Sequence, residues 1–327
     1  MEKNILVVGG AGYIGSHMVR ALLDEKYNPI VFDNLSTGHR EFVPEEATFI
    51  QGDLRNIQDV RKSFERYPVN AVMHFAASSL VPESMSNPLK YYGNNVSACI
   101  NLLKAMLEHK VERFIFSSTA AVYGEPGSIP IREEDKTNPT NPYGRSKLMI
   151  ENILKDVSRS HDFSYITLRY FNAAGAHPSG EIGEIHNPET HLIPNILKVA
   201  KGTKDALTIS GDDYPTQDGT CIRDYIHVQD LCKAHLLALE ALNNGVKNEV
   251  FNLGNGDGFS VRGVVNTVEK VTGLKINAKV GPRRPGDPAK LVACADKTKK
   301  VLGWSPHENL EEIIRTAWNW EKKINQA

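Results

Sequence analysis

Apolar runs of strand length alternate with helical stripes through the first half of the chain. The runs are rich in Val, Ile and Phe, and they predict strands at Asn4–Val8, Pro29–Phe32, Thr48–Gln51, Ala71–Phe75, Arg113–Ser117 and Tyr165–Leu168. Two of the helical stripes between them consist of Ile14, Met18, Ala21 and Leu22, and of Val96, Cys99, Ile100, Leu103 and Leu107. This alternation predicts an α/β fold with a doubly wound parallel sheet that is covered by helices on both faces.

The helix that we predict from Tyr143 is apolar on nearly all sides. Its apolar residues are Leu148, Met149, Ile150, Ile153, Leu154 and Val157. A helix that is apolar all round is buried on more than one face. One face can cover the sheet, and the opposite face, together with the stripe at 96–107, can meet a second subunit. We therefore expect a homodimer, with a core formed within one chain as the alternative.

The rhythm of the sequence changes after about residue 172. Loops rich in Gly, Pro and Asp then separate short helices and strands, as in AAGAHPSGEIGE, SGDDYPTQDGT and GPRRPGDPAK. Long loops in a compact fold are usually functional or mobile. We predict a nucleotide-binding domain at 1–172 and a smaller mixed α/β substrate-binding region at 173–327, part of which returns to the first domain. The chain closes with an amphipathic helix around Leu310–Trp318.

Composition and charge narrow the classes of partner. The 327 residues are 41% hydrophobic and 24% charged, with a net charge of −1, which gives no electrostatic reason to expect nucleic acid or a membrane surface. The chain shows no signal peptide and no membrane-spanning apolar run. Cys99, Cys221, Cys232 and Cys294 stand singly, and His17, His227 and His235 lack metal-ligand spacing. We expect a reduced cytoplasmic protein without a structural metal.

A glycine-rich turn follows the first predicted strand and opens the first helix. In VVGGAGYIGSH, Gly10, Gly12 and Gly15 fit G-x-G-x-x-G, and Gly9 joins Gly12 and Gly15 in an overlapping pattern. Glycines here permit a tight turn, the approach of a pyrophosphate to a helix N-terminus, and close packing of helix and strand. With Asp33 about 20 residues further on, the pattern indicates a Rossmann-type dinucleotide site.

Acidic residues at the ends of the next strands select the dinucleotide. A carboxylate at Asp33 would bind a ribose 2′-hydroxyl and repel a 2′-phosphate, so NAD is favoured over NADP, although Arg40 lies nearby in the sequence. Asp53, after the third strand, could bind the adenine or cap a turn. The residues FAAS at 75–78 end the fourth strand, at the sheet edge where ligands bind.

Hydroxyls, a tyrosine and a lysine form the candidate catalytic set. Ser117, Ser118 and Thr119 come at the end of the fifth strand. In NPYGRSK at 141–147, Asn141 can cap a helix with Pro142 at its first position, so Tyr143 and Lys147 lie one turn apart on one face. A free tyrosine has a pKa of about 10. We expect Lys147, the positive nicotinamide ring and the helix N-terminus to lower the pKa of Tyr143.

With these motifs in order, the chain resembles the extended short-chain dehydrogenase/reductase family, and within it the enzymes that epimerise UDP sugars at C4. The resemblance covers nearly the whole chain and is carried by GGAGYIGSH, DNLSTG, GDLR, HFAA, YYGNNV, FSSTAAVYG, NPYGRSKL, RYFNAAGAHPSGEIGE, GDDYPTQDGTCIRDYIHV, NLGNG and RRPGD. It implies an NAD site formed by Gly9, Gly10, Gly12, Tyr13, Ile14, Gly15, Asp33, Asn34, Leu35, Ser36, Thr37, Gly38, Asp53, Leu54, Phe75, Ala76, Ala77, Ser78, Ser79, Asn94, Lys147 and Phe171. It implies contacts to the sugar nucleotide from Thr119, Tyr143, Asn172, His191, Leu192, Arg223, Arg284, Asp287 and Leu291.

The resemblance also implies a reaction, the interconversion of UDP-galactose and UDP-glucose in galactose metabolism. Tyr143 would take the proton of the sugar 4-hydroxyl while hydride passes from C4 to tightly bound NAD. After the 4-keto sugar turns over, NADH would return hydride to the opposite face of C4 and Tyr143 would return the proton. Thr119 and Lys147 would assist, and the net reaction would be an isomerisation. Arg223 and Arg284 would hold the diphosphate.

Other activities remain open at this point. Because Leu291 is of intermediate size, UDP sugars with an N-acetyl group stay open as alternative substrates, and UDP-linked uronic acids are a further alternative. A 4,6-dehydratase is disfavoured, because such relatives carry an Asp-Glu pair where Ala120 and Ala121 follow Thr119. A non-catalytic NAD-binding regulator would need neither the Tyr and Lys pair nor the arginines. Ser79, His191 and Ser210 depart from the residues usual in the family.

Overall fold

The structure of the protein is a computed structural model that describes residues 3–284 and 287–324. The chain forms two compact units. The first unit contains Met1–Glu125, Lys136–Arg169 and Cys232–Phe251, and the second contains Pro126–Asp135, Tyr170–Leu231 and Asn252–Ala327. Each unit is therefore built from segments that are distant in the sequence.

A seven-stranded sheet forms the centre of the first unit, in the order β11-β6-β5-β4-β1-β2-β3. Its strands are β1 (Asn4–Val8), β2 (Asn28–Asp33), β3 (Thr48–Gln51), β4 (Ala71–His74), β5 (Arg113–Thr119), β6 (Ser164–Tyr170) and β11 (Glu249–Leu253). The pairs β1–β2, β1–β4, β2–β3 and β4–β5 are parallel. The α/β fold with a doubly wound sheet is confirmed, and β11 is a strand that the sequence analysis did not identify.

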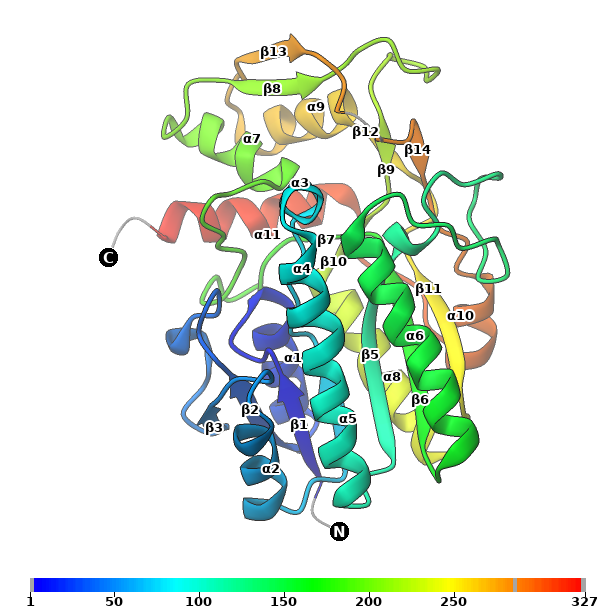
Figure 1. The fold of residues 1–327 in the computed structure, drawn as a ribbon. Coiled ribbons are helices and arrows are strands. Elements are labelled where there is room, and N and C mark those ends of the chain that lie inside the picture. The colour runs from blue at the N-terminus through cyan, green and yellow to red at the C-terminus, as the bar shows by residue number, and fades with distance from the viewer. Residues whose placement is uncertain (1–2, 285–286, 325–327) are drawn as a thin grey trace. The chain divides into compact units, whose positions relative to one another are not determined.

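Helices cover both faces of this sheet, with α5 and α6 in front of the strands and α8 behind them in Figure 1. The helices are α1 (Tyr13–Asp24), α2 (Ile57–Arg66), α3 (Val81–Ser86), α4 (Pro88–Tyr91), α5 (Ala98–Glu108), α6 (Pro142–Ser160) and α8 (Val228–Asn243), with short 3₁₀ turns η1 (Arg40–Phe42) and η3 (Ala120–Val122). Alternate strand residues such as Leu6, Phe32 and Phe116 pack against α2, α5 and α6 in one apolar core. The strands are buried on both faces, which explains their continuous apolar sequences.

The helical stripe predicted at 96–107 begins within a π-helix, which the sequence analysis did not predict. Residues Tyr92–Ser97 form a π-helix, η2, and the α-helix begins only at Ala98. The wider turn of a π-helix shifts the side chains that follow, and such turns occur frequently at functional sites. Apolar spacing alone does not distinguish this geometry from an α-helix.

The second unit has its own core between three helices and small sheets. Its elements are β7 (Asn172–Ala174), α7 (Leu192–Lys201), β8 (Leu207–Ser210), β9 (Ile222–Arg223), β10 (Tyr225–His227), β12 (Phe259–Ser260), α9 (Val261–Thr272), β13 (Ala278–Gly281), β14 (Lys290–Leu291), α10 (Asp296–Leu302) and α11 (Leu310–Lys323). Helices α7, α9 and α11 pack against one another, and Ile196, Val264 and Ile313 are fully buried between them. The predicted amphipathic C-terminal helix is confirmed as α11.

The cysteines and the hydrophobicity of the helices bear on two further expectations from the sequence. All four cysteines are free and buried. Within residues 3–284 and 287–324, no helix combines the length and the apolar character that a bilayer crossing requires.

Candidate active site

The turn between β1 and α1 brings the motif glycines into contact with the backbone around them. A Cβ atom on Gly15 would lie 2.1 Å from the Gly9 carbonyl oxygen, and one on Gly9 would lie 2.5 Å from the Ala76 nitrogen. Gly9 also has a φ of +80°, which side chains rarely adopt. Glycine is therefore required at both positions by the protein itself.

Gly12 differs from these glycines, and the difference points to a ligand. It is the N-cap of α1, with a φ of −80° that any residue can adopt, and a Cβ there would meet only the Gly9 oxygen at 3.4 Å. The fold thus tolerates a side chain at this position. A missing side chain in front of the first turn of a 12-residue helix opens the backbone N–H groups to an anion. The turn fits the pyrophosphate of a dinucleotide.

A Gly15→Ala substitution is expected to release the dinucleotide. Because the added methyl would overlap backbone atoms rather than a mobile side chain, the turn must shift away from the N-terminus of α1. We expect the purified variant to lose most of its bound cofactor, measured by absorbance after the protein is unfolded in acid. Gly127→Ala is the matched control, since its Cβ would meet nothing within 4 Å. A Gly15→Ala protein with wild-type cofactor content would contradict this account of the turn.

Asp33 ends β2 and is held by two backbone N–H groups. Its Oδ2 accepts from Ala11 N at 3.0 Å and its Oδ1 from Leu35 N at 2.8 Å. Burial raises the pKa of Asp33, and these hydrogen bonds oppose that rise. A carboxylate oxygen has more than one acceptor site, so Asp33 can still accept from a ribose hydroxyl. Arg40 instead donates to the Val43 carbonyl at 3.1 Å and lies over the Phe49 ring.

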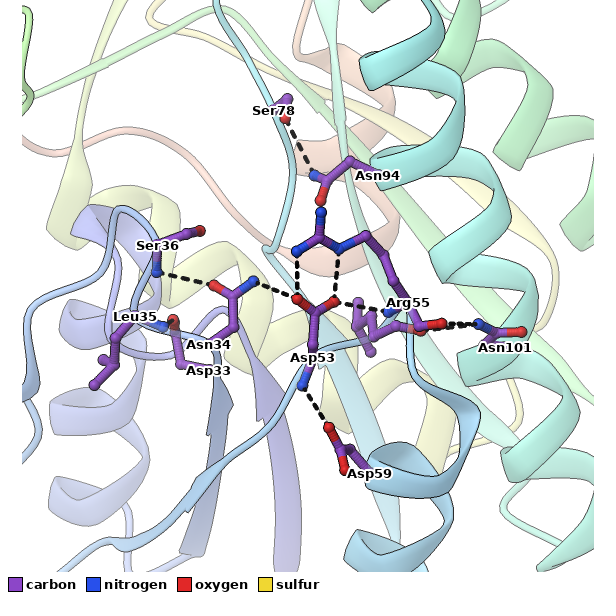
Figure 2. Close-up of polar contacts among 11 residues, drawn as sticks. Asp33, Asn34, Leu35, Ser36, Asp53, Arg55, Asp59, Ser78, Asn94 and Asn101 are labelled. Carbon is purple, nitrogen blue, oxygen red and sulfur yellow. Dashed lines mark hydrogen bonds and ion pairs between the residues drawn. The ribbon is translucent and has the colours of Figure 1, made fainter.

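Asp53 is the centre of a polar cluster after β3, shown in Figure 2. Its two carboxylate oxygens accept from Arg55 Nε at 2.9 Å and Arg55 Nη2 at 2.6 Å, and Oδ2 also accepts from Asn34 Nδ2 at 3.1 Å. Arg55 N also donates to Oδ1 at 2.8 Å, so Asp53 does cap its own turn. The bonds from Arg55 hold the pKa of Asp53 well below its usual range. The cluster is an anchor for the loops after β2 and β3.

The loop after β4 is held by two asparagines of the π-helix η2. Asn95 is buried, accepts from Ser78 N at 2.8 Å and donates to Ser78 O and Ser146 Oγ, both at 3.0 Å. Asn94 donates to Ser78 Oγ at 3.2 Å, as Figure 2 shows. The sequence analysis identified Asn94 but missed Asn95, although the two are adjacent in YYGNNV. Together they fix the backbone of the loop that carries the predicted cofactor residues.

The remaining predicted cofactor residues are partly accessible. Phe75, Ala76 and Ala77 are half-buried, whereas Ser79 is exposed. The Leu54 side chain packs in the core of the first unit, which leaves only its backbone for a ligand. Phe171 follows β6 and belongs to the second unit.

The three hydroxyls at the end of β5 make different contacts. Ser118 Oγ donates to Glu151 Oε1 at 2.6 Å, and Ser117 Oγ lies 3.3 Å from His235 Nε2. Thr119 caps the short turn η3, since its Oγ1 accepts from Ala121 N at 3.1 Å. The Thr119 hydroxyl also acts on Tyr143, since it opposes a rise in the pKa of that phenol. Thr119 is therefore the hydroxyl of this strand end that is associated with the predicted catalytic tyrosine.

The predicted start of α6 is confirmed. Asn141 is the N-cap, its side chain accepts from Gly144 N at 2.9 Å, and Pro142 is the first helical residue. Tyr143 therefore lies in the first turn, with its ring edge against Tyr91 at a centroid distance of 6.5 Å. Burial raises the pKa of Tyr143, and the hydrogen bond from Thr119 opposes the rise.

The ammonium of Lys147 binds the end of β5. Its side chain is buried, and its ammonium donates to the Ser117 carbonyl at 2.8 Å. Burial lowers the pKa of Lys147 to about 8, against opposing effects of Cys99 and Glu151. Burial and Thr119 shift the pKa of Tyr143 in this structure, and the lowering of that pKa by Lys147 stays a prediction. A buried ammonium needs an acceptor, and the end of β5 supplies one.

A buried ion pair lies beneath these residues and was missed by the sequence analysis. Arg169 on β6 donates to Glu151 of α6 through Nε at 3.0 Å and Nη2 at 2.6 Å, and through Nη1 to the Tyr123 hydroxyl at 2.8 Å. The exposed fractions of the Arg169 and Glu151 side chains are 4% and 1%. In the sequence, the position of Glu151 one helical turn after Lys147 was the signal that could have indicated a buried carboxylate here. The pair joins α6 to the end of β5 through Ser118.

In the second unit, the structure brings several predicted substrate residues together. Arg223 on β9 forms an ion pair with Asp287 and stands opposite Leu291 of β14 in the parallel register. Asp287 N donates to the Arg284 carbonyl at 3.3 Å, while the Arg284 side chain is exposed. The next residue after Arg223, Asp224, binds the Asn172 backbone N–H through its carbonyl at 3.0 Å.

Asp224 is a structural carboxylate that the sequence analysis overlooked. It is fully buried and accepts from the backbone N–H groups of Asn255 at 2.6 Å and of Gly256 and Ala293 at 3.0 Å. These bonds connect β9 to the NLGNG turn and to β14. They hold the strands that carry Arg223 and Leu291 in place.

His191 is the N-cap of α7 and Leu192 is its first residue. In the part of the chain that the structure describes, no hydrogen bond or ion pair joins either residue to Arg223. The His191 side chain instead meets a cluster formed with Glu184, His186 and Glu189. Burial opposes protonation of both histidines, yet the neighbouring glutamates raise the pKa of His186 to about 10 and also raise that of His191. The spacing EIHNPETH was the signal for this cluster in the sequence.

Comparison with known proteins gives full-length matches. The sequence profile of the family described as "NAD dependent epimerase/dehydratase family" matches residues 5–254. The chain is 50% identical over 319 residues to a UDP-glucose 4-epimerase of Lacticaseibacillus casei, covering 97% of this chain and 96% of the relative. It is also similar to a crystal structure of a UDP-glucose 4-epimerase, with a TM-score of 0.97, 53% identity and coverage of 99% and 98% of the two chains. A UDP-glucose 4-epimerase from Brucella ovis in complex with NAD has a TM-score of 0.94, 46% identity and coverage of 97% of each chain.

Proposed function

The chain belongs to the NAD dependent epimerase/dehydratase family, and from this premise we propose that it interconverts UDP-galactose and UDP-glucose with bound NAD. The observation that carries the proposal is the placement of Tyr143, in the first turn of α6, beside the end of β5 that carries Thr119, in the unit that also holds the glycine turn and Asp33. A phenol in this position can exchange a proton with a sugar hydroxyl. The full-length similarity to UDP-glucose 4-epimerases supports the choice of sugar.

In this reaction the Tyr143 oxygen takes the proton of the sugar 4-hydroxyl and later returns it. Thr119 donates a hydrogen bond at the same place and stabilises the tyrosine when it is ionised. Bound NAD would supply the hydride acceptor for C4 of the sugar and, after the 4-keto sugar has turned over, would return the hydride to the opposite face of C4. Tyr143 then protonates the oxygen at C4, so the enzyme ends the cycle in its starting form.

Lys147 acts on the cofactor in this proposal. An ammonium has three donors, and one of them is used by the Ser117 carbonyl. The others are free to bind hydroxyls of the nicotinamide ribose. Asp33 accepts from the adenine ribose, and the backbone at Gly12 and Tyr13 binds the pyrophosphate.

The arginines of the second unit are proposed to bind the diphosphate of the UDP sugar. Arg223 is held by Asp287 and by the Ile222 carbonyl, to which Nη1 donates at 2.8 Å. A guanidinium has five donors, so these bonds leave Arg223 donors for phosphate oxygens. The exposed Arg284 adds a second cation, and Asn172, His191 and Leu192 complete the proposed set.

Epimerisation is favoured over dehydration by the residues next to Thr119. Loss of water from the sugar needs an additional acid and base, and Ala120 and Ala121 supply neither. Both alanines form the η3 turn directly after Thr119. Epimerisation needs only one group that accepts a proton and later returns it, which Tyr143 provides.

The test is to incubate the purified protein with UDP-galactose, without adding NAD, and to identify the product by NMR. We expect UDP-glucose at the equilibrium ratio, because no net oxidation occurs and the bound cofactor is regenerated in each cycle. A 4-keto-6-deoxy product would identify a dehydratase, and a folded, NAD-loaded protein without turnover would identify a binding protein.

The same assay with other UDP sugars decides the breadth of the substrate range. Leu291 is half-buried in β14, beside Arg223. Its intermediate size is compatible with an N-acetyl group, so UDP-N-acetylglucosamine is the first sugar to compare, followed by UDP-glucuronic acid.

We propose further that the protein acts as a homodimer in the cytoplasm, in galactose metabolism. Support for a dimer comes from apolar side chains exposed on the helices around α6. Met149 of α6 is 44% exposed, and Met85 and Leu89 of the neighbouring α3 and α4 are 62% and 79% exposed. Exposed apolar groups on adjacent helices favour an interface. A solution mass of one chain by light scattering would contradict the dimer.

A further inference from the structure

Four potential metal ligands converge in the loop before α7. Glu184, His186, Glu189 and His191 each offer one ligand atom, and these atoms all lie within 4.8 Å of one another. The expectation of a chain without a structural metal was based on the single cysteines and on His17, His227 and His235. It did not consider the segment 184–191. The cluster lies within the second unit and plays no part in the proton transfer at Tyr143.

The histidine nitrogens converge with the carboxylates on one region. Nδ1 of His186 is buried and forms ion pairs with Glu184 Oε1 at 3.2 Å and Glu189 Oε2 at 3.8 Å, but it is not aligned for a hydrogen bond with either oxygen. Nδ1 of His191 faces the same Oε1 of Glu184. Two imidazole nitrogens and two carboxylates therefore point at one small region, and one of the nitrogens has no aligned partner there.

The charges and their burial fit a divalent ion. The Glu184 and Glu189 side chains are only 5% and 4% exposed, and buried carboxylates are unfavourable unless a cation compensates them. Without a metal, the two histidines can compensate them as cations; with neutral imidazoles, one divalent ion balances the same two negative charges. The His191 side chain is 49% exposed and leaves a path for the ion from solvent.

The surrounding structure already orients the ligands. Glu189 Oε1 accepts from the backbone N–H groups of Thr190 and His191, both at 2.8 Å, so its Oε2 is turned toward His186. The backbone carbonyl of Glu184 accepts from Trp320 Nε1 of α11 at 3.0 Å. Such outer contacts are typical of sites that hold a metal.

We propose that Glu184, His186, Glu189 and His191 form a binding site for one zinc ion. Two imidazoles with two carboxylates favour zinc over magnesium, which prefers an all-oxygen shell. Four-coordinate zinc with bonds of about 2.0–2.2 Å places its ligand atoms about 3.3 Å apart, so small side-chain rotations complete the shell. The ion would fasten the loop to the N-terminus of α7, next to Leu192.

The experiment uses the full-length, NAD-loaded protein after treatment with a chelator and dialysis. Zinc chloride is titrated by calorimetry and the melting temperature is recorded with and without zinc. We expect one zinc per chain, a higher melting temperature with zinc and no comparable effect of magnesium. Cobalt in place of zinc should give the visible absorption of a four-coordinate site.

Variants localise the site. His186→Ala is expected to weaken zinc binding by roughly 100-fold or more, because loss of even an outer contact costs about 10- to 100-fold. Glu189→Gln should weaken it as well, and His161→Ala, an exposed histidine at the end of α6, should leave it unchanged. Circular dichroism and NAD content confirm that each variant is folded.

Two outcomes would overturn the proposal: a wild-type protein that binds no zinc, or zinc binding that is the same in folded His186→Ala as in the wild type. The measurement does not depend on turnover of a UDP sugar. Its failure is therefore distinguishable from failure of the proposed function.

Discussion

Tyr143→Phe is expected to lower the rate of UDP-galactose turnover by about 10²- to 10⁴-fold, the range contributed by a positioned proton-transfer group. The phenylalanine ring can occupy the same place against Tyr91, so the fold and the NAD content should not change. The variant lacks only the oxygen that takes the proton of the 4-hydroxyl. The loss should therefore appear in kcat rather than in the binding of UDP sugar.

The matched control is Tyr27→Phe, which removes a phenol oxygen elsewhere in the same unit. Tyr27 follows α1, and its ring is covered by the Lys3 ammonium at 4.7 Å. We expect this control to turn over UDP-galactose like the wild type. Near wild-type turnover by folded Tyr143→Phe would remove Tyr143 from the mechanism.

The second large effect is expected for stability, from Arg169→Met. Removal of the guanidinium leaves the Glu151 carboxylate buried without its ion-pair partner, while the Ser118 hydroxyl still donates to it. Breaking a buried pair in this way costs about 3–5 kcal/mol of unfolding free energy. The midpoint of urea unfolding, followed by circular dichroism, should fall accordingly.

A double variant separates the cost of the unpaired charge from the loss of packing. In Glu151→Gln with Arg169→Met, neither charge of the pair remains, and the amide oxygen can still accept from Ser118, so much of the lost stability should return. Arg159→Met is the control on the same helix, since it removes an exposed pair with Asp156 and should not change the midpoint measurably. A double variant as unstable as Arg169→Met alone would show that the unpaired carboxylate is not the cause.

Features that depend on local spacing could be predicted from the sequence. The strands of the first unit follow from apolar runs, because strands buried on both faces need continuous apolar side chains. Asn141 and Pro142 signalled the start of α6, since capping depends on residues that are neighbours in the chain. The glycine turn was recognisable for the same reason.

Features that depend on distant partners could not be predicted in this way. The sequence places Lys147 one turn from Tyr143, but only the fold brings the Ser117 carbonyl to its ammonium. The partner of Glu151 lies 18 residues away on β6, and Asn95 reaches Ser146 across 51 residues. The segment Pro126–Asp135 belongs to the second unit, although it stands between two segments of the first. Its Ile131 pairs with Ala293, a contact that no local pattern indicates.

The fate of the hydrogen atom at C4 tests the proposed reaction most directly. UDP-galactose with deuterium at C4 is incubated with the NAD-loaded protein in ordinary water, without added NAD, and the product is examined by NMR. We predict UDP-glucose that retains deuterium at C4, because the atom removed from the sugar returns to the same carbon while Tyr143 exchanges only the hydroxyl proton. UDP-glucose that has lost the label to solvent, or no UDP-glucose from a folded and NAD-loaded protein, would contradict the account.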